Sequence, residues 1–330
     1  MNASSAAAVF ERLRGSLNAG AIHAGARRPF KFFVCGDPGL LGELRALLLA
    51  GHDGDAIPID AAAAFETLDL QRAVDTTDAR AIICVARATD RGALGLERLA
   101  ALRLPVLALI VDRDVTAPSG PSQAPPAGGV EEYVVDRVAL EPLRGRFLPH
   151  LIDCCKGIEV AVGRRLPMLR DTVAAKLTRD AATSALKVAG ASAVVDHVPI
   201  LGVVLGAFAS GADMFAITGI QMNLMLNIGA TYGRDPDLGQ MWELLPIVGG
   251  GFGWRALARE LSGFIPVGGV FIKAAIAYAG TTVVGEGVAF FYRNGRQMNG
   301  EDASRIYDDA KASAMTFARD LLTRFRRNGG

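Results

Sequence analysis

Three glycines follow the first strongly apolar stretch at a spacing that suits phosphate binding. Residues 36–44 are Gly-Asp-Pro-Gly-Leu-Leu-Gly-Glu-Leu, between the apolar run 30–36 and a helical pattern over 40–49. Glycines at such a turn let backbone N–H groups at a helix N-terminus approach an anion. Gly36, Gly39 and Gly42 are therefore the candidate cofactor-binding residues, although we expect no cofactor, with GTP as the alternative.

The same segment departs from a phosphate loop that hydrolyses triphosphates. Such a loop has the form GxxxxGK followed by Ser or Thr, but five residues separate Gly36 from Gly42. Glu43 stands where Lys would meet the phosphates, and Leu44 stands where a hydroxyl would hold Mg²⁺. Because Glu replaces an attraction by a repulsion, we expect neither hydrolysis nor catalytic residues here.

Three other interpretations of these residues stay open. In a nucleotide-responsive switch, Asp114 after the run 105–111 would contact the guanine base, although its usual Asn and Lys companions are absent. In an NAD(P)-binding oxidoreductase, GxxGxxG would be the turn of an extended short-chain dehydrogenase and Asp60 would bind ribose. That enzyme needs a Tyr and a Lys converging on the turn, and we expect none there. Alternatively, the glycines serve only close packing.

The elements around this turn predict an α/β domain over residues 30–150. Continuous apolar runs at 30–36, 81–86, 105–111 and 131–135, with a shorter candidate at 56–60, are typical of strands buried on both faces. Helical patterns, including 94–102, separate them, which predicts a parallel sheet with helices on both sides. Residues 117–129 are rich in Pro, Gly, Ala and Ser, which indicates a surface loop.

The second half of the chain has few charges. From Val188 to Tyr292, 11 of 105 residues are Asp, Glu, Lys or Arg, against 58 of the remaining 225. Helical periodicity over 173–187, 214–233 and 302–327 predicts an all-α domain at 151–330. Residues 1–29 are expected to form a tail or a short amphipathic helix, without a signal peptide because charges interrupt every apolar run.

Isolated polar residues mark this helical domain. Residues 214–233 contain no Asp, Glu, Lys, Arg or His, and about 20 apolar residues span a bilayer. Asp213 either caps a helix that begins at Met214 or pairs with Lys273, while Gln221 is expected to bond between helices. Lys273 and Glu286 fall in the apolar stretch 264–292, where each charge would be costly at mid-bilayer.

Composition excludes several classes of protein. A formal net charge of +1 argues against a nucleic-acid partner. Four Cys in 330 residues argue against a disulfide scaffold. Cys35 and Cys84 fall in apolar runs expected to be core, and no Cys or His has metal-ligand spacing. We therefore predict no metal site and a cytoplasmic setting.

Four segments of the second half carry a family resemblance. They are Gly211-Ala-Asp-Met-Phe through Tyr232-Gly233, Gly253-Trp-Arg through Glu260, Phe264-Ile-Pro266, and Ala277-Tyr-Ala-Gly-Thr-Thr through Gly285. Over roughly residues 155–295 the chain resembles the YcjF-like domain of unknown function. That resemblance implies a membrane protein whose helical domain follows an Era-like GTPase domain, so residues 30–150 would be a degenerate P-loop GTPase-like domain.

Together these observations predict a non-enzymatic, membrane-associated scaffold or regulatory protein. We expect it at the cytoplasmic face of the membrane, peripheral or inserted as a hairpin, with a soluble cytoplasmic protein as the alternative. The expected partner is a membrane or membrane protein, or else a protein partner or a second copy of the chain.

Overall fold

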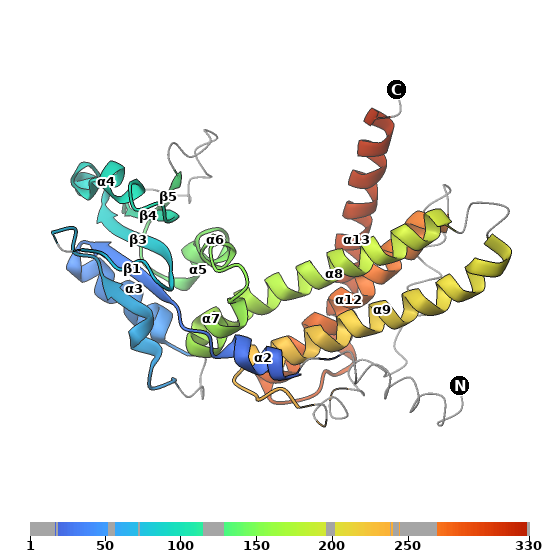
Figure 1. The fold of residues 1–330 in the computed structure, drawn as a ribbon. Helices are drawn as coiled ribbons and strands as arrows, with labels where there is room; N and C mark the ends of the chain where they lie inside the picture. The colour runs from blue at the N-terminus through green and yellow to red at the C-terminus, as the bar shows by residue number, and fades with distance from the viewer. Residues whose placement is uncertain are drawn as a thin grey trace. The chain divides into compact units, whose positions relative to one another are not determined.

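The chain forms two units in a computed structural model. The structure describes Leu17 and residues 19–51, 57–71, 73–114, 129–195, 202–237, 239, 244 and 269–328, with backbone alone at 190–195, 202–214, 269–273, 314–315 and 317–328. One unit is Ala24–Val173, and the other is Met1–His23 with Ala174–Gly330. We call them the α/β unit and the helical unit (Figure 1).

The α/β unit is built on a parallel sheet, as the sequence predicts. Its strands are β1 (Lys31–Gly36), β2 (Phe65–Thr67), β3 (Ala79–Arg87), β4 (Val106–Val111) and β5 (Val130–Val135), in the order β2-β1-β3-β4-β5. All six residues of β4 are buried, which explains its unbroken apolar sequence. This order is that of doubly wound flavodoxin-like sheets.

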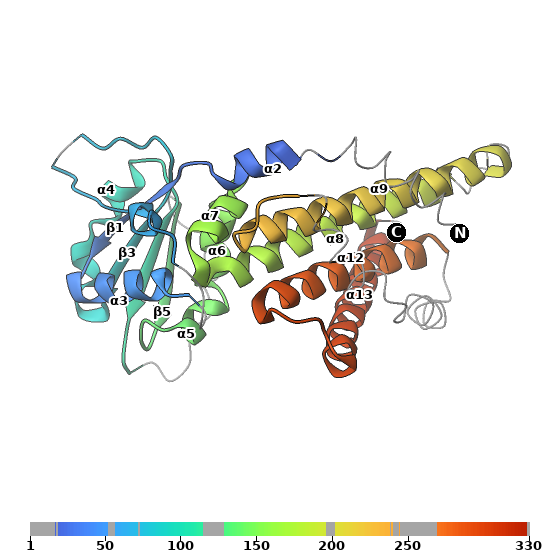
Figure 2. The same ribbon diagram turned by 90° about the horizontal axis from the view of Figure 1, so that it is seen from below.

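Helices cover both faces of this sheet. The helices of the unit are α3 (Pro38–Leu49), α4 (Leu96–Ala100), α5 (Leu140–Arg144), α6 (Phe147–Asp153) and α7 (Glu159–Arg165), and α2 (Ala19–Ala26) crosses the unit boundary. Figures 1 and 2 show α3 and α4 on opposite sides of the sheet. On the α4 side, Phe33 of β1 and Cys84 of β3 form a core with Leu99.

Two sequence predictions about this unit are wrong. Residues 57–60 of the candidate strand 56–60 form loop and turn, and the short strand is instead Phe65–Thr67, after a 3-10 helix at Ala61–Ala64. The domain boundary lies at Val173 and Ala174 rather than at residue 150. The helix α7 and the end of α6 fall in the segment expected to be all-α, but they belong to the α/β unit.

Four long helices make the part of the helical unit that the structure describes. They are α8 (Arg170–Val195, whose first turn lies before the boundary), α9 (Gly202–Thr231), α12 (Gly269–Asn294) and α13 (Gly300–Asn328). Gln221 bonds Thr281 and Tyr232 stacks on Tyr292, so α9 and α12 run parallel. The ring centroids of the two tyrosines are 5.8 Å apart. Parallel neighbours need a long connection, which residues 232–268 provide.

The helix α8 runs antiparallel to α12. Its Thr178 lies beside Gly285, whereas Ala189, further along α8, shares a cluster with the earlier residue Ala277. Met225, Ile228 and Val288 lie at the centre of the unit with Leu17, which is buried there too. Figures 1 and 2 show α8, α9 and α12 side by side. The coarse prediction of α/β followed by all-α structure is therefore confirmed.

The start of α9 corrects one prediction. The helix begins at Gly202, so Asp213 lies well inside it and is not the N-cap of a helix beginning at Met214. Gly206 and Gly211 lie within this helix, after its first residue Gly202. Residues 1–16 of the predicted N-terminal tail or helix and residues 117–128 of the predicted loop 117–129 lie outside the described residues.

Candidate functional site

The predicted phosphate-binding turn is only one residue long. β1 ends at Gly36 and α3 begins at Pro38, so Asp37 alone connects them. The Asp37 carboxylate caps α3 by accepting a 3.0 Å hydrogen bond from the Leu40 N–H. Gly39 and Gly42 lie inside α3 rather than in a loop. The chain's own carboxylate thus occupies the position where a bound phosphate would meet the helix N-terminus.

Asp37 is also held from the neighbouring strand. The Arg87 Nε at the end of β3 donates to Asp37 Oδ2 over 3.3 Å. The Leu40 N–H, and to a smaller degree Arg87, hold the pKa of Asp37 below its usual range. This contact lies between β1 and β3, the topological switch point where doubly wound sheets usually bind ligands. The geometry of the turn therefore gives no support to nucleotide binding.

The two carboxylates assigned to nucleotide recognition lie apart from this turn. Asp60 pairs with Arg165 of α7, with 2.9 Å between Oδ2 and Nε. Asp114 lies in the turn after β4, where its N–H donates to Asp112 Oδ1 over 3.1 Å. Since β3 separates β4 from β1, Asp114 is not a neighbour of the glycines in the sheet.

The chain has one Tyr-x-x-x-Lys spacing, at Tyr307 and Lys311 in α13. Tyr307 packs against Ala275 and Ala279 of α12, within the helical unit. The glycine turn belongs to the other unit. This spacing therefore adds no support to the oxidoreductase interpretation.

One of the four polar residues predicted in the helical unit forms the expected inter-helix bond. Gln221 Nε2 of α9 donates to Thr281 Oγ1 of α12 over 3.3 Å, and Thr281 is fully buried. Glu286 is half-buried in α12 and has an interaction of its own. The side chains of Asp213 and Lys273 lie outside the description, so their pairing stays a prediction.

A hydrogen-bonded cluster between β5 and α6 was not predicted. Glu131 Oε2 accepts from the Tyr133 hydroxyl over 2.8 Å and lies 2.8 Å from His150 Nδ1. The Tyr133 hydroxyl also contacts His150, and burial together with Glu131 raises the pKa of Tyr133. Burial raises the pKa of Cys154 to about 11, so this thiol stays protonated at neutral pH. The cluster therefore joins β5 to α6.

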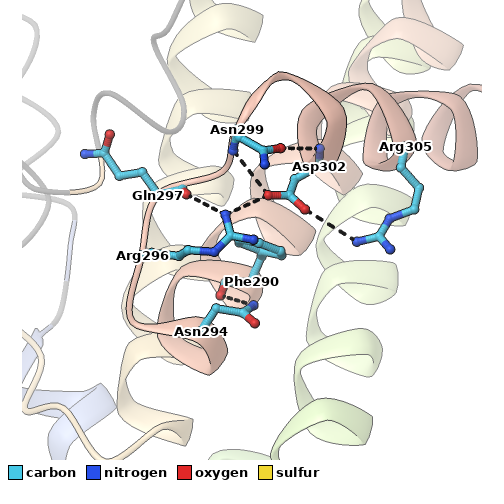
Figure 3. Close-up of polar contacts among 7 residues, drawn as sticks. All are labelled: Phe290, Asn294, Arg296, Gln297, Asn299, Asp302 and Arg305. Atoms are coloured by element: carbon cyan, nitrogen blue, oxygen red, sulfur yellow. Dashed lines mark hydrogen bonds and ion pairs between the residues drawn. The ribbon is translucent and has the colours of Figure 1, made fainter.

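The corner between α12 and α13 is a second polar site that was not predicted (Figure 3). Asn299 Oδ1 accepts from the Asp302 N–H, and Asp302 Oδ2 accepts in turn from the Asn299 N–H. This reciprocal pair is a capping box. Arg296 donates to Asp302 over 2.7 Å and lies over the Phe290 ring. The corner thus fixes the turn that reverses the chain after α12.

Replacing Asp302 is expected to loosen this corner in a pH-dependent way. Arg296 first, and then the Asn299 N–H, hold the pKa of Asp302 below its usual range. The stabilisation is therefore complete above the unfolded-state pKa of about 3.9 and is lost as the pH falls through the lower folded-state pKa. Asp302→Ala should lower the Tm at pH 7, Asp302→Asn should lower it less, and both differences should shrink at acidic pH. Asp308→Ala, at an exposed site of the same helix, is the control, and a difference independent of pH would contradict the assignment.

One described helix is long and apolar enough to cross a membrane. It is the segment Ala274–Asn294 of α12, with mean hydropathy 1.4 and 67% of its most apolar part buried. No group of His, Cys, Asp and Glu suited to a metal ion occurs among the described residues. Comparison of the chain with protein-family models, curated proteins and solved structures finds no match.

Proposed function

We propose that the chain is a non-enzymatic scaffold or regulatory protein whose helical unit associates with a membrane at its cytoplasmic face. The observation that carries this proposal is the segment Ala274–Asn294, which has the length and hydropathy of a membrane span. The proposal includes the YcjF-like character of the helical unit and the GTPase-like ancestry of the α/β unit.

The polar groups of α9 and α12 support the proposal. A lipid-embedded helix must satisfy such groups internally. Asn227 Nδ2 donates to the Asn223 carbonyl, Thr231 to the Asn227 carbonyl, and Thr282 to the Tyr278 carbonyl. Together with the bond between Gln221 and Thr281, these contacts keep polar groups paired within or between apolar helices.

Small residues at the helix contacts also support membrane association. A Cβ added at Gly229 would lie 3.0 Å from the Tyr292 hydroxyl, and one at Gly285 would lie 2.8 Å from the Thr178 Cβ. Close approach at small residues is typical of helices packed within membranes. The α/β unit supports the scaffold part of the proposal, because Asp37 and Arg87 occupy its switch point.

Flotation of the full-length protein tests the membrane part. We expect the purified chain to float with vesicles of phosphatidylcholine and phosphatidylserine in a density gradient. Val283→Lys puts a charge near the middle of Ala274–Asn294 at a half-buried position. It should reduce flotation several-fold, because a charge in lipid costs about 2.5–3.5 kcal/mol by insertion scales.

The control adds the same charge elsewhere. Ile57 is 52% exposed in the α/β unit, so Ile57→Lys should float as the unaltered chain does. Circular dichroism verifies that both variants keep their helices. A chain that stays at the bottom of the gradient with every vesicle would contradict membrane association, and flotation of Val283→Lys at the full level would contradict a role for α12.

A further inference from the structure

Two cysteine side chains meet on neighbouring strands of the sheet. Cys35 of β1 and Cys84 of β3 are direct partners in the parallel register. Adjacent strands lie about 4.8 Å apart, within the range of Cα separations that a disulfide spans. The two Sγ atoms are 3.1 Å apart, and both cysteines are free thiols. A disulfide would require the two sulfurs to approach by about 1 Å.

The two thiols differ in exposure and in acidity. Cys84 is fully buried, whereas Cys35 is half-buried near the end of its strand. The hydrogen bond from Cys84 lowers the pKa of Cys35, against the opposing effect of burial. The same bond, with burial, raises the pKa of Cys84. Cys35 is thus the more acidic and the more exposed of the two thiols, and Cys84 lies beside it in position to react second.

We propose that Cys35 and Cys84 form a reversible oxidation site, at which a hydroperoxide converts the two thiols to a disulfide between β1 and β3. The inference does not depend on membrane association. It assigns Cys35 as the attacking residue and Cys84 as the resolving residue.

The reaction balances with hydrogen peroxide as the oxidant. The Cys35 thiolate attacks one peroxide oxygen, the O–O bond breaks, and the departing hydroxide takes up a proton to become water. Cys84 then gives up its proton as its sulfur attacks the Cys35 sulfenic acid, and the S–O bond breaks to release a second water. Two thiols lose two electrons and two protons in total, and a dithiol reductant reverses the change by exchange.

The other two cysteines are an internal control. Cys155 is fully buried and burial raises its pKa, and burial likewise raises the pKa of Cys154 to about 11. Reactivity toward peroxide follows the thiolate fraction and exposure. Cys154 and Cys155 should therefore remain reduced while Cys35 and Cys84 react.

The experiment treats the reduced full-length protein with hydrogen peroxide, alkylates the remaining thiols and maps the peptides by mass spectrometry. We expect the free thiols to fall from four to two, a cross-linked peptide joining Cys35 to Cys84 that is lighter by two hydrogens, and full reversal by dithiothreitol. The rate should rise with pH and level off at a lower pH than for free cysteine.

Variants separate this pair from general oxidation. Cys35→Ser should leave Cys84 reduced, Cys84→Ala should leave a sulfenic acid on Cys35 that dimedone traps, and Cys154→Ser should cross-link as the unaltered chain does. Four free thiols after a peroxide exposure that fully oxidises glutathione would overturn the proposal. Oxidation of Cys84 in Cys35→Ser, or a cross-link through Cys154, would overturn it as well.

Discussion

Replacing Gly36 by Ala is expected to destabilise the α/β unit by about 3–5 kcal/mol. Gly36 has a φ of +118°, a conformation that only glycine adopts readily. A Cβ at this position would overlap the Val85 carbonyl oxygen and lie 2.8 Å from the carbonyl carbon. Backbone on the neighbouring strand cannot move aside as a flexible side chain can. The variant must therefore shift β1 relative to β3.

The other glycines of the motif provide the control. Gly42 lies in α3, is exposed and has open space around the position of a Cβ. Gly42→Ala should therefore be neutral or should stabilise the unit by up to about 1 kcal/mol, because Ala is the better helix former. Denaturation of both variants, with hydrogen exchange at the β1 and β3 amides, measures the difference. Equal effects of the two substitutions would contradict a packing role for Gly36.

This pair of variants also separates packing from ligand binding. If the glycines served a phosphate, Gly42→Ala would matter for binding although it leaves the fold intact. If they serve the fold, only Gly36 matters, because it alone lies against the Val85 backbone. Sequence spacing treats the three glycines as equivalent, whereas the structure gives them three different environments.

The sequence predicts most strands because a strand that is buried on both faces has an almost continuous apolar sequence. Residues such as Ile82, Leu107 and Leu109 are fully buried, so nearly every position of β3 and β4 is apolar. The edge strand Phe65–Thr67 has only three residues, of which two are exposed. Its short, half-polar sequence does not have this apolar pattern, and the strand was therefore predicted at the run 56–60 instead.

Helix ends were predicted less well than helices. The prediction for Asp213 rested on the preference of Asp for an N-cap, but the apolar helix continues through it from Gly202. Two helix N-caps, Asp37 and Asn299, were not predicted, although each lies in a sequence pattern that is typical of a helix start. Asp37 precedes Pro at the first helical position, and Asn299 precedes Asp302 by three residues, as a capping box requires.

The contacts of the candidate residues depend on distant parts of the chain. Arg87 meets Asp37 across 50 positions, and Thr281 meets Gln221 across 60. Cys35 and Cys84 are 49 positions apart. Strand register and helix direction bring these residues together, and neither follows from local periodicity. An inter-helix bond was predicted for Gln221, but its partner Thr281 and the contact between Asp37 and Arg87 were not.

Gly285→Ala is expected to destabilise the helical unit even though Ala favours helix formation. A Cβ at Gly285 would overlap the Thr178 hydroxyl and lie 2.6 Å from its Cγ2 and 2.8 Å from its Cβ. Thr178 is 3% exposed, so its side chain has little room to move. Overpacking of this kind costs about 1–3 kcal/mol, against a gain of up to about 1 kcal/mol from helix propensity. Packing should therefore decide the sign.

A double-mutant cycle with Thr178→Ala tests whether this contact is the cause. Thr178→Ala removes the hydroxyl and Cγ2, and that hydroxyl is buried without a hydrogen-bond partner among the described residues. The double variant should therefore recover part of the stability lost by Gly285→Ala, although the two Cβ atoms would still lie 2.8 Å apart, and thermal unfolding of the purified full-length protein measures this recovery. Gly300→Ala is the matched control, because a Cβ there meets open space, and its Tm should change little. Additive effects at Gly285 and Thr178 would mean that α8 and α12 do not meet at this point, whereas a positive coupling would locate the closest approach of the two helices at this pair.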